Sequence, residues 1–339
     1  MANPGANLSI TQIAKLALDQ GYDVLADTYK PKDLFWTKVC TVRPVAEAVH
    51  YPFGHRSVGA GRIGKPQKRS PGQPFVADTV EAGYVRQCAL QEYVTSLPIP
   101  IEILDAVGGQ AEFNRKVVDF ATGFGAVAGE WRESIVADFI QRGTIAAGDP
   151  TIFNQAYGDF PDANVGFIYD GKPLYAASGN AHPLKSVANT GSQGVNLVAS
   201  GADLDGTTLD TGYIQVTQTN AVDERGNRIT VTPKYLMGGS AMRTTILRLL
   251  NSEWLPGTGN NDINPNRGLL EPLIWPLLDD DTNAWWIHGA EALTAFDGAN
   301  VLDTVYDEST KTLHLRGSIR FGIYATDWRH TYCANKASS

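Results

Sequence analysis

A run of about 30 residues with helical spacing constrains the fold of this chain more than any other feature. Its apolar residues recur in steps of three and four, at Phe113, Val117, Phe120, Phe124, Val127, Trp131, Ile135 and Phe139. Side chains with this spacing lie on one face of a helix, here roughly 45 Å long. The sequence therefore predicts a single helix over 111–142, longer than is usual in a globular protein.

Three glycines interrupt this helix, at Gly123, Gly125 and Gly129. Each costs about 1 kcal/mol relative to alanine, so a helix that keeps all three needs a reason for them. One reason is close packing against a crossing element, and the other is a site where the helix bends. The spacing favours neither.

The remaining patterns predict an α+β organisation. A short amphipathic helix begins with a capping box at Ser9 and Gln12 and is expected to end at Gly21. A second short helix is expected over about 240–252. The β-like runs are "VGFIYDGKPLYAA", "GYIQVTQTN", "RITVTPKYLMGG", "LLEPLIWPLL", "AWWIHG" and "TLHLRGSIRFGIYAT".

The stretch from about 38 to 97 is too long for an ordinary loop and too apolar at its ends for a linker. A long two-stranded excursion fits better, although a hairpin alone is marginally stable in water. It is either a loose surface insertion or an arm that packs on a neighbouring subunit. Its tip carries the basic cluster of the chain, at Arg56, Arg62, Lys65, Lys68 and Arg69.

The letters "GAGRIG" at 59–64 match the glycine fingerprint of dinucleotide-binding loops. That fingerprint requires a buried strand before it and a helix after it. Here Pro52 and Gly54 precede it, and prolines at 66, 71 and 74 follow and prevent a helix. We therefore expect no nucleotide cofactor at this loop.

Composition narrows the class of protein. The chain has 339 residues, of which 43% are hydrophobic, with a formal net charge of −8. Such a chain is expected to be globular, and an acidic balance argues against a protein that grips nucleic acid. The sequence has no run long enough to cross a membrane, and Lys15 and Asp19 interrupt the apolar residues expected of a signal peptide. We expect synthesis in the cytoplasm.

Motifs for catalysis or metal binding are weak. "GFIYDGKP" at 166–173 resembles a phosphate-binding loop but has Pro173 in place of the essential hydroxyl residue. The six histidines lack zinc-site spacing, and the three cysteines form no CxxC pair. Asp279, Asp280 and Asp281 are more typical of a solvated turn than of a cation site. We expect neither an enzyme, nor a metal site, nor a cofactor.

The predicted helix over 111–142 also carries a cluster of charged residues. Glu130, Arg132 and Glu133 are expected on the polar side of the long helix. Two carboxylates there could serve acid–base chemistry, but charges on such a face are usually solvated or at an interface.

Five segments together carry a family resemblance: "SLPIPIEIL" before the long helix, "NAHPLKSVANTGSQGVNL", "RITVTPKYLMGGSAMRTTILRLLNSE", "NDINPNRGLLEPLIWPLL" and "IRFGIYATDWRHTY". In this order the chain resembles the major capsid proteins of tailed phages. It is most similar to the Mu-like major head subunit group, which has the Hong Kong 97-type fold.

The resemblance implies names for the parts of the chain. Residues 1–37 would be an N-terminal arm, and 38–97 an E-loop that lies over an adjacent subunit. Residues 98–180 would be the peripheral domain, with 111–142 as its spine helix. An axial domain would span 181–300, and strands in 301–339 would return to complete the β-structure.

The resemblance also implies an assembly. Hexamers and pentamers of the chain would close into an icosahedral shell around double-stranded DNA, without sequence-specific binding and without a membrane. A separate scaffolding protein, a portal and possibly a decoration protein would be partners. Assembly in the host cytoplasm would end in the virion. Lys65 and Lys68 are placed either for a covalent cross-link or for charge contacts between subunits.

Three alternatives remain open from sequence. The same fold would serve a bacterial nanocompartment shell or the head of a gene-transfer agent. A nucleotide-binding enzyme would use the loop at 59–64. A sugar-binding protein would need an exposed aromatic platform, for which Trp285 and Trp286 are candidates, although adjacent strand residues point to opposite faces.

Overall fold

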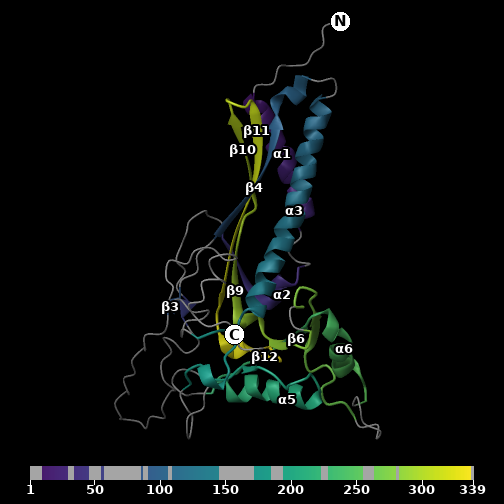
Figure 1. Cartoon of the computed structure of the whole chain (residues 1–339), viewed down its shortest axis with the longest axis vertical. Coiled ribbons are helices and arrows are strands. Elements are labelled where there is room, and N and C mark those ends of the chain that lie inside the picture. The colour runs from purple at the N-terminus through teal and green to yellow at the C-terminus, as the bar shows by residue number, and fades with distance from the viewer. Residues whose placement is uncertain are drawn as a thin grey trace, which may run out of the picture.

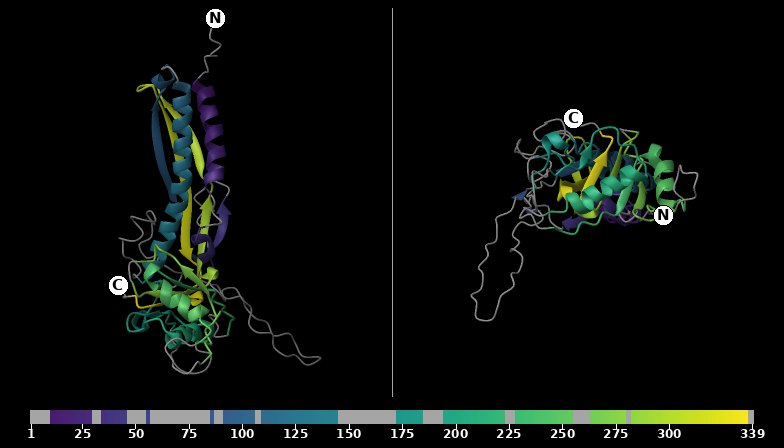
Figure 2. Two further views of the ribbon diagram at one scale, coloured as in Figure 1. Left: turned by 90° about the vertical axis from the view of Figure 1, so that its right-hand side faces the viewer. Right: turned by 90° about the horizontal axis from the view of Figure 1, so that it is seen from below.

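The structure of the protein is a computed structural model, which describes residues 10–29, 34–45, 55–56, 85–86, 91–105, 109–144, 172–184, 194–222, 228–254, 263–279 and 282–336. Two sheets and a long helix dominate these residues (Figure 1). The α+β class is confirmed. An elongated half holds the long helix and the first sheet, and a rounder half holds the second sheet (Figures 1 and 2).

The first sheet has five strands and is built largely from the two ends of the chain. Its strands are β1 (Cys40–Val45), β4 (Gln91–Pro100), β9 (Leu293–Gly298), β10 (Val301–Asp307) and β11 (Thr312–Ala325). The long β11 pairs antiparallel with β4 along one edge and with β10 and β9 along the other. β1 then pairs in parallel with β9. Along β11 alternate residues are buried, as expected for a sheet covered on one face.

Helix α3 (Gly109–Gln141) covers that face, with α1 (Ile10–Thr28) beside it. The predicted helix over 111–142 is thus confirmed, while α1 runs seven residues beyond its expected end. Gly21 lies inside α1 rather than at its end, and it is buried where a side chain would meet Leu302 of β10. Phe113 and Val117 pack with Leu313 and Leu315 of β11 in one buried cluster.

The second sheet lies at the other end of α3 and has the order β5-β12-β8-β6-β7. Its strands are β5 (Leu197–Val198), β6 (Tyr235–Gly238), β7 (Glu271–Ile274), β8 (Trp285–His288) and β12 (Thr331–Ala334). One face packs against the end of α3 and the lower part of the first sheet. The other face packs against α5 (Gly206–Ile214) and α6 (Arg243–Asn251).

Trp285 and Trp286 divide between these two cores. Trp285 packs with the α5–α6 side and Trp286 with the α3 side, and both are fully buried. The alternation expected for neighbouring strand residues holds, but neither indole is free to form an exposed platform. A sugar-binding surface built on these two residues is therefore excluded.

The strand predicted at 212–220 is wrong. The run "GYIQVTQTN" at 212–220 is helical, since α5 continues into a π-helical turn at Gln215–Thr219. Asp205 caps α5 by accepting the backbone N–H of Thr208, whose hydroxyl accepts the Asp205 N–H in return. Leu209, Gly212 and Val216 then follow at helical spacing and are buried.

Shorter helical segments complete the described chain. They are α2 (Trp36–Val39) and the 3-10 turns Ile101–Asp105, Ser178–Asn180, Ser240–Met242, Ala290–Ala292 and Trp328–His330. The helix expected over 240–252 is thus a 3-10 turn followed by α6. Of the predicted strand at 165–177, only 172–177 is described, and it is not a strand.

The excursion between β1 and β4 is described at two points. β2 (His55–Arg56) pairs antiparallel with β3 (Val85–Arg86), as expected for a two-stranded segment. Its two roots enter different parts of the first sheet, because β1 pairs with β9 and β4 with β11. The fingerprint at 59–64 lies outside the described residues.

The "HP…TGSQ…NL" stretch has a structural role where it is described. A side chain at Gly194 would collide with the ring of Trp328, which also stacks on His182. The Asn196 side chain accepts the N–H of Ala176 and donates to the carbonyl of Leu174, at 2.8 Å each. Buried polar groups need such partners, so this motif stabilises the junction of three segments.

Candidate functional site at the junction of α1, α3 and the first sheet

Arg132 is the central residue of a buried polar cluster where α1, α3 and the first sheet meet. It lies on α3 and is fully buried. Its Nε donates to Asp297 Oδ1 at 2.8 Å, and its terminal nitrogens donate to the side-chain oxygen of Asn300 at 2.8 Å and to the carbonyls of Ala128 and Gly298. Four of its five donors are therefore satisfied across α3 and the β9–β10 junction.

Aromatic rings enclose the charge of Arg132. The guanidinium carbon lies 5.0 Å from the ring centre of Tyr29 and 5.8 Å from that of Phe321. Both distances suit a cation–π contact, which is stronger where water is excluded. Tyr29 follows α1 directly, so this contact fixes the end of that helix over α3.

Burial shifts the titration of the neighbouring groups. It raises the pKa of the Asp297 carboxyl, and the Arg132 guanidinium opposes the shift. It also raises the pKa of the Tyr29 hydroxyl well above the usual range, again with Arg132 opposing. The buried Arg132 guanidinium thus favours the ionised form of Asp297 against the effect of burial.

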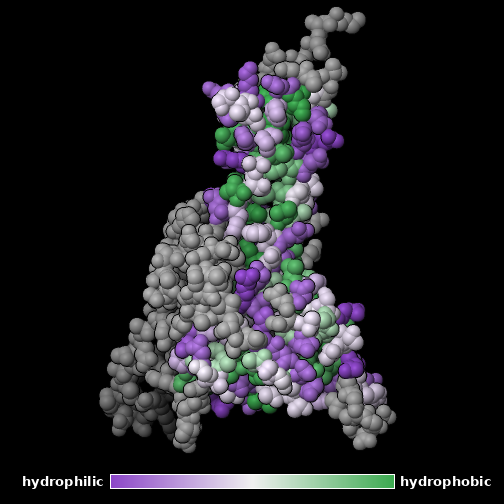
Figure 3. All heavy atoms as spheres, in the orientation of Figure 1, coloured by the Kyte–Doolittle hydropathy of each residue, from purple (hydrophilic) through white to green (hydrophobic). Residues whose placement is uncertain are grey.

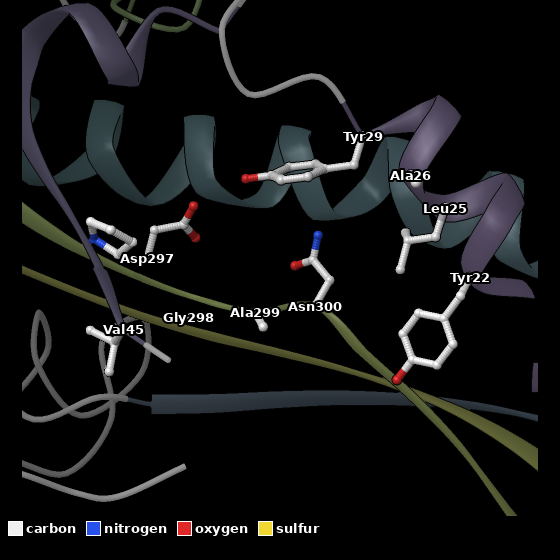
Figure 4. Close-up of a pocket in the computed structure, with 10 residues that line it drawn as sticks. Tyr22, Leu25, Ala26, Tyr29, Val45, Asp297, Gly298, Ala299 and Asn300 are labelled. Carbon is white, nitrogen blue, oxygen red and sulfur yellow. The ribbon is translucent and has the colours of Figure 1, made fainter. Parts of the chain in front are cut away.

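A hollow of about 510 Å³ opens beside this cluster (Figure 4). Tyr22, Leu25, Ala26 and Tyr29 of the N-terminal segment form one wall, and the end of β1 with the β9–β10 junction forms the other. Asp297 and Asn300 supply its polar groups, and the Tyr29 ring lies over them. Arg132 already occupies the inner side of both polar side chains.

Glu133 secures a second junction one residue along α3. Its carboxylate accepts the backbone N–H of Phe35, which directly precedes α2. Burial raises the pKa of Glu133, and the N–H groups of Phe35 and Trp36 oppose the shift. Because β1 follows α2, this contact anchors one root of the 38–97 excursion to α3.

The expected polar face of the long helix is therefore wrong for two of its three residues. Glu130 is exposed, whereas Arg132 and Glu133 are buried. Conversely, Val127 and Trp131 were expected on the apolar face but are 52% and 40% exposed. The buried stripe instead passes through Ala128 and Arg132, since α1 approaches closely enough that small residues and a paired arginine fit there.

The three helix glycines have different surroundings. A side chain at Gly125 would meet Thr28 Cβ at 2.9 Å and Leu25 at 3.3 Å, so close packing of α1 explains this glycine. At Gly129 the nearest atom is Leu34 Cδ1 at 3.4 Å, an ordinary contact distance. Gly123 has nothing within 4 Å and is exposed, so packing does not account for it.

Most residues of the predicted basic tip lie outside the described part of the chain. Arg56 is in β2, and the structure describes its backbone only. Arg62, Lys65, Lys68 and Arg69 are outside the described residues, as are Asp280 and Asp281. The tip therefore stays a prediction from sequence.

The polar contacts of this site join separate elements of the fold. No group of three or more His, Cys, Asp or Glu residues is gathered for a metal within them. None of the helices in the described part is long and apolar enough to span a bilayer. The Arg132 guanidinium donates to Asp297, Asn300 and two backbone carbonyls, and the Glu133 carboxylate accepts a backbone N–H, an arrangement that joins elements.

Comparison with known proteins identifies the family of the chain. The model of the phage capsid protein family matches residues 114–334, which is more than half of the chain. The chain therefore belongs to the phage capsid protein family. A search of curated protein sequences found no significant match.

Solved structures of similar shape are distant in sequence. The capsid of an empty GTA particle is 13% identical, with 99% of this chain and 94% of that chain covered and a TM-score of 0.45. The mature capsid of bacteriophage PhiM1 is 11% identical, with 89% and 86% covered and a TM-score of 0.46. A phage-related protein from Bordetella bronchiseptica RB50 is 12% identical, with 96% and 97% covered and a TM-score of 0.43. The family assignment rests on the sequence match alone.

Proposed function

We propose that this chain is a major capsid protein that assembles into hexamers and pentamers, which close into an icosahedral shell around phage double-stranded DNA. The observation that carries the proposal is the family match across 114–334. It includes most of α3, the whole second sheet and all of β11, so the parts that define the fold of the subunit belong to a capsid protein. The chain then acts without catalysis.

We further propose the Hong Kong 97-type fold and the Mu-like head subunit group for this chain. Residues 1–37 serve as the N-terminal arm and 38–97 as the E-loop. Residues 98–180 with α3 form the peripheral domain, 181–300 the axial domain, and 301–339 the returning strands. Sheet membership favours ending the axial domain near 292, because β9 belongs with β10 and β11.

The acidic body suits a container for DNA. A shell with a net charge of −8 per subunit encloses the polymer without the salt-dependent grip of a basic lining. A separate scaffolding protein, a portal and possibly a decoration protein complete the head. The product is the virion, assembled in the host cytoplasm.

Electron microscopy of the purified full-length chain, with light scattering for mass, tests this proposal. We expect closed polyhedral shells or capsomers of five and six subunits. A compact monomer that stays monomeric at high concentration, even when co-expressed with a scaffolding protein from the same phage, would overturn the assignment. Native particles that hold a protein cargo and no DNA would instead indicate a nanocompartment.

A further inference from the structure

One stretch at the edge of the first sheet has no strand on its outer side among the described residues. β4 is the outermost strand on its side, and among the described residues its backbone pairs only with β11 (Figure 2). A free strand edge presents unpaired N–H and C=O groups that can pair with another chain. The question is which residues of β4 offer these groups.

Tyr22 on α1 shows, through the register of the sheet, which backbone groups of β4 point away from β11. The hydroxyl of Tyr22 donates to the carbonyl of Leu302 and accepts its N–H, so Leu302 of β10 turns its backbone away from β11. Gly317, opposite Leu302, therefore turns its own backbone toward β4, where its partner is Thr95. Because strand residues alternate, Glu92, Val94 and Ser96 turn theirs outward.

The upper half of the same edge is closed by proline. Pro98 and Pro100 occupy the next outward positions and lack the N–H that a further strand would need. The open donors are thereby restricted to Glu92, Val94 and Ser96. This set is symmetric about Val94.

The other edges of the sheet carry protection. Tyr22 caps β10 at Leu302, and Asp303 and Asp307 place charges along that strand. β1 has Arg43 and Pro44 near its end. Charges and prolines of this kind discourage pairing of strand edges. On β4 the charge of Glu92 is instead paired with Arg320 at 3.2 Å.

Apolar side chains flank the open stretch on both faces of the sheet. Val94 is 62% exposed on the outer face. On the inner face Tyr93 meets the edge of the Trp131 ring, with centroids 5.4 Å apart. Val127 lies one turn before Trp131 on α3, so the two exposed side chains that left the predicted apolar stripe border this edge. On the face seen in Figure 3, hydrophobic (green) and hydrophilic (purple) residues are interspersed along the elongated half.

We infer that β4 pairs antiparallel with β4 of a second copy of this chain, about a two-fold axis at Val94. Val94 would exchange both backbone hydrogen bonds with Val94 of the partner subunit, and Glu92 would do so with Ser96 of the partner subunit. The open groups of one copy thus satisfy those of the other, as an isologous contact requires. The inference rests on the proposed self-assembly.

Antiparallel pairing also has a consequence for arrangement. It places the second sheets of the two copies at opposite ends of the pair. The second sheet of each copy can then belong to a different ring of subunits, and the elongated halves form the contact between the two neighbouring rings. Trp131 and Val127 would be covered by the same contact.

Disulfide trapping tests the pairing. In a hydrogen-bonded antiparallel pair, opposed Cα atoms lie about 5.5 Å apart, within the range that a disulfide spans. Val94→Cys would be made in a Cys88→Ser background, since Cys40 and Cys333 are buried. The matched control is Val305→Cys in the same background, because Val305 is also exposed, at 41%, on the outer face of the opposite edge strand. The full-length chain is oxidised in whatever species it forms at high concentration.

We expect about tenfold more disulfide-linked dimer from Val94→Cys than from Val305→Cys, since only the former is held at a high effective concentration. Equal yields from the two variants would overturn the pairing, whether the sample holds shells or free subunits. Electron microscopy of the same samples keeps the two questions apart. Shells without the Val94 cross-link would retain the proposed function and refute this inference.

Discussion

At the scale of single residues, burial of charge separates two of the arginine–aspartate pairs that involve the first sheet. Arg132 is buried and bonds to Asp297, Asn300 and two carbonyls. Arg316 binds Asp303 in a two-pronged pair at 2.6 and 2.7 Å, yet both side chains remain at least 42% exposed. Water can replace the partners of Arg316 but not those of Arg132.

We therefore predict that Arg132→Lys lowers the free energy of unfolding by about 3 kcal/mol or more, because lysine cannot satisfy the planar set of acceptors and leaves buried groups unpaired. Arg316→Lys is the matched control and should cost less than about 1 kcal/mol. Denaturant unfolding of the free subunit measures both. Equal losses would contradict the role assigned to Arg132.

His288 provides the pH-dependent prediction. Its Nε2 lies 2.8 Å from the carbonyl of Val39 and so must donate, which leaves Nδ1 to accept from the Thr331 hydroxyl at 3.1 Å. Burial lowers the pKa of His288 to about 4; nearby His330 also lowers it, and Glu291 opposes the shift.

The direction in which stability changes with pH follows from proton uptake by the unfolded chain. The unfolded chain binds a proton at His288 near pH 6.5, whereas the folded chain resists it until about pH 4. Stability from this residue is therefore present above pH 6.5 and is lost toward pH 4, by at most about 1.4 kcal/mol per pH unit. We predict a shallower slope for His288→Gln across this window and an unchanged slope for His314→Gln, measured by denaturant unfolding at several pH values.

At the scale of elements, the contact between α1 and α3 decides what each helix glycine does. Alanine at Gly125 gains about 1 kcal/mol of helix propensity but overpacks against Thr28 and Leu25, at a cost of about 1–3 kcal/mol. We predict that Gly125→Ala is destabilising overall. Gly123→Ala meets nothing and should stabilise the subunit by up to about 1 kcal/mol. Thermal unfolding compares the two.

The Gly125→Ala and Gly123→Ala variants also distinguish close packing from helix bending as the reason for these glycines. If Gly123 serves as a bend in the assembling shell, Gly123→Ala will give a more stable subunit that forms fewer mature particles. Normal assembly and maturation of Gly123→Ala, and of the variant with alanine at all three helix glycines, would count against a bend.

Elements with strong internal patterns were predictable from the sequence, and elements defined by their partners were not. α3, β8 and β11 carry long periodic or β-branched and aromatic runs, and the structure has them where expected. β9 and β10 were missed, since the runs "LTAFDG" and "VLDTVYD" become strands through pairing with β11. The burial of Arg132 also escaped prediction, because its acceptors lie 165 or more residues away, except for Ala128.

At the scale of the whole molecule, one hydrophobic cluster joins the elongated and rounder halves. It includes Trp36 and Leu293 from the region of the first sheet, Ile135 from α3, and Trp286 from the second sheet. The His288–Val39 bond crosses the same junction. Forces applied to either sheet are thus carried through packed side chains at the lower end of α3.

Charge is distributed unevenly over the chain. The five basic residues of the tip contribute +5 to a formal net charge of −8, which leaves −13 for the remainder. A cationic tip is attracted to the acidic bodies of other copies, and salt screens that attraction. We predict that glutamine at all five positions weakens assembly at low salt and leaves the unfolding of the free subunit unchanged.

Light scattering of assembly between about 0.05 M and about 0.5 M NaCl measures this effect, because exposed charges are screened over that range. The native chain should lose assembly as salt rises, and the tip variant should respond much less. The control replaces five other basic residues with glutamine, at Lys15, Arg115, Lys116, Arg267 and Lys311. If both variants lose the same salt dependence, total charge rather than the tip governs association. Only a loss specific to the tip variant supports contact between the tip and a neighbouring subunit.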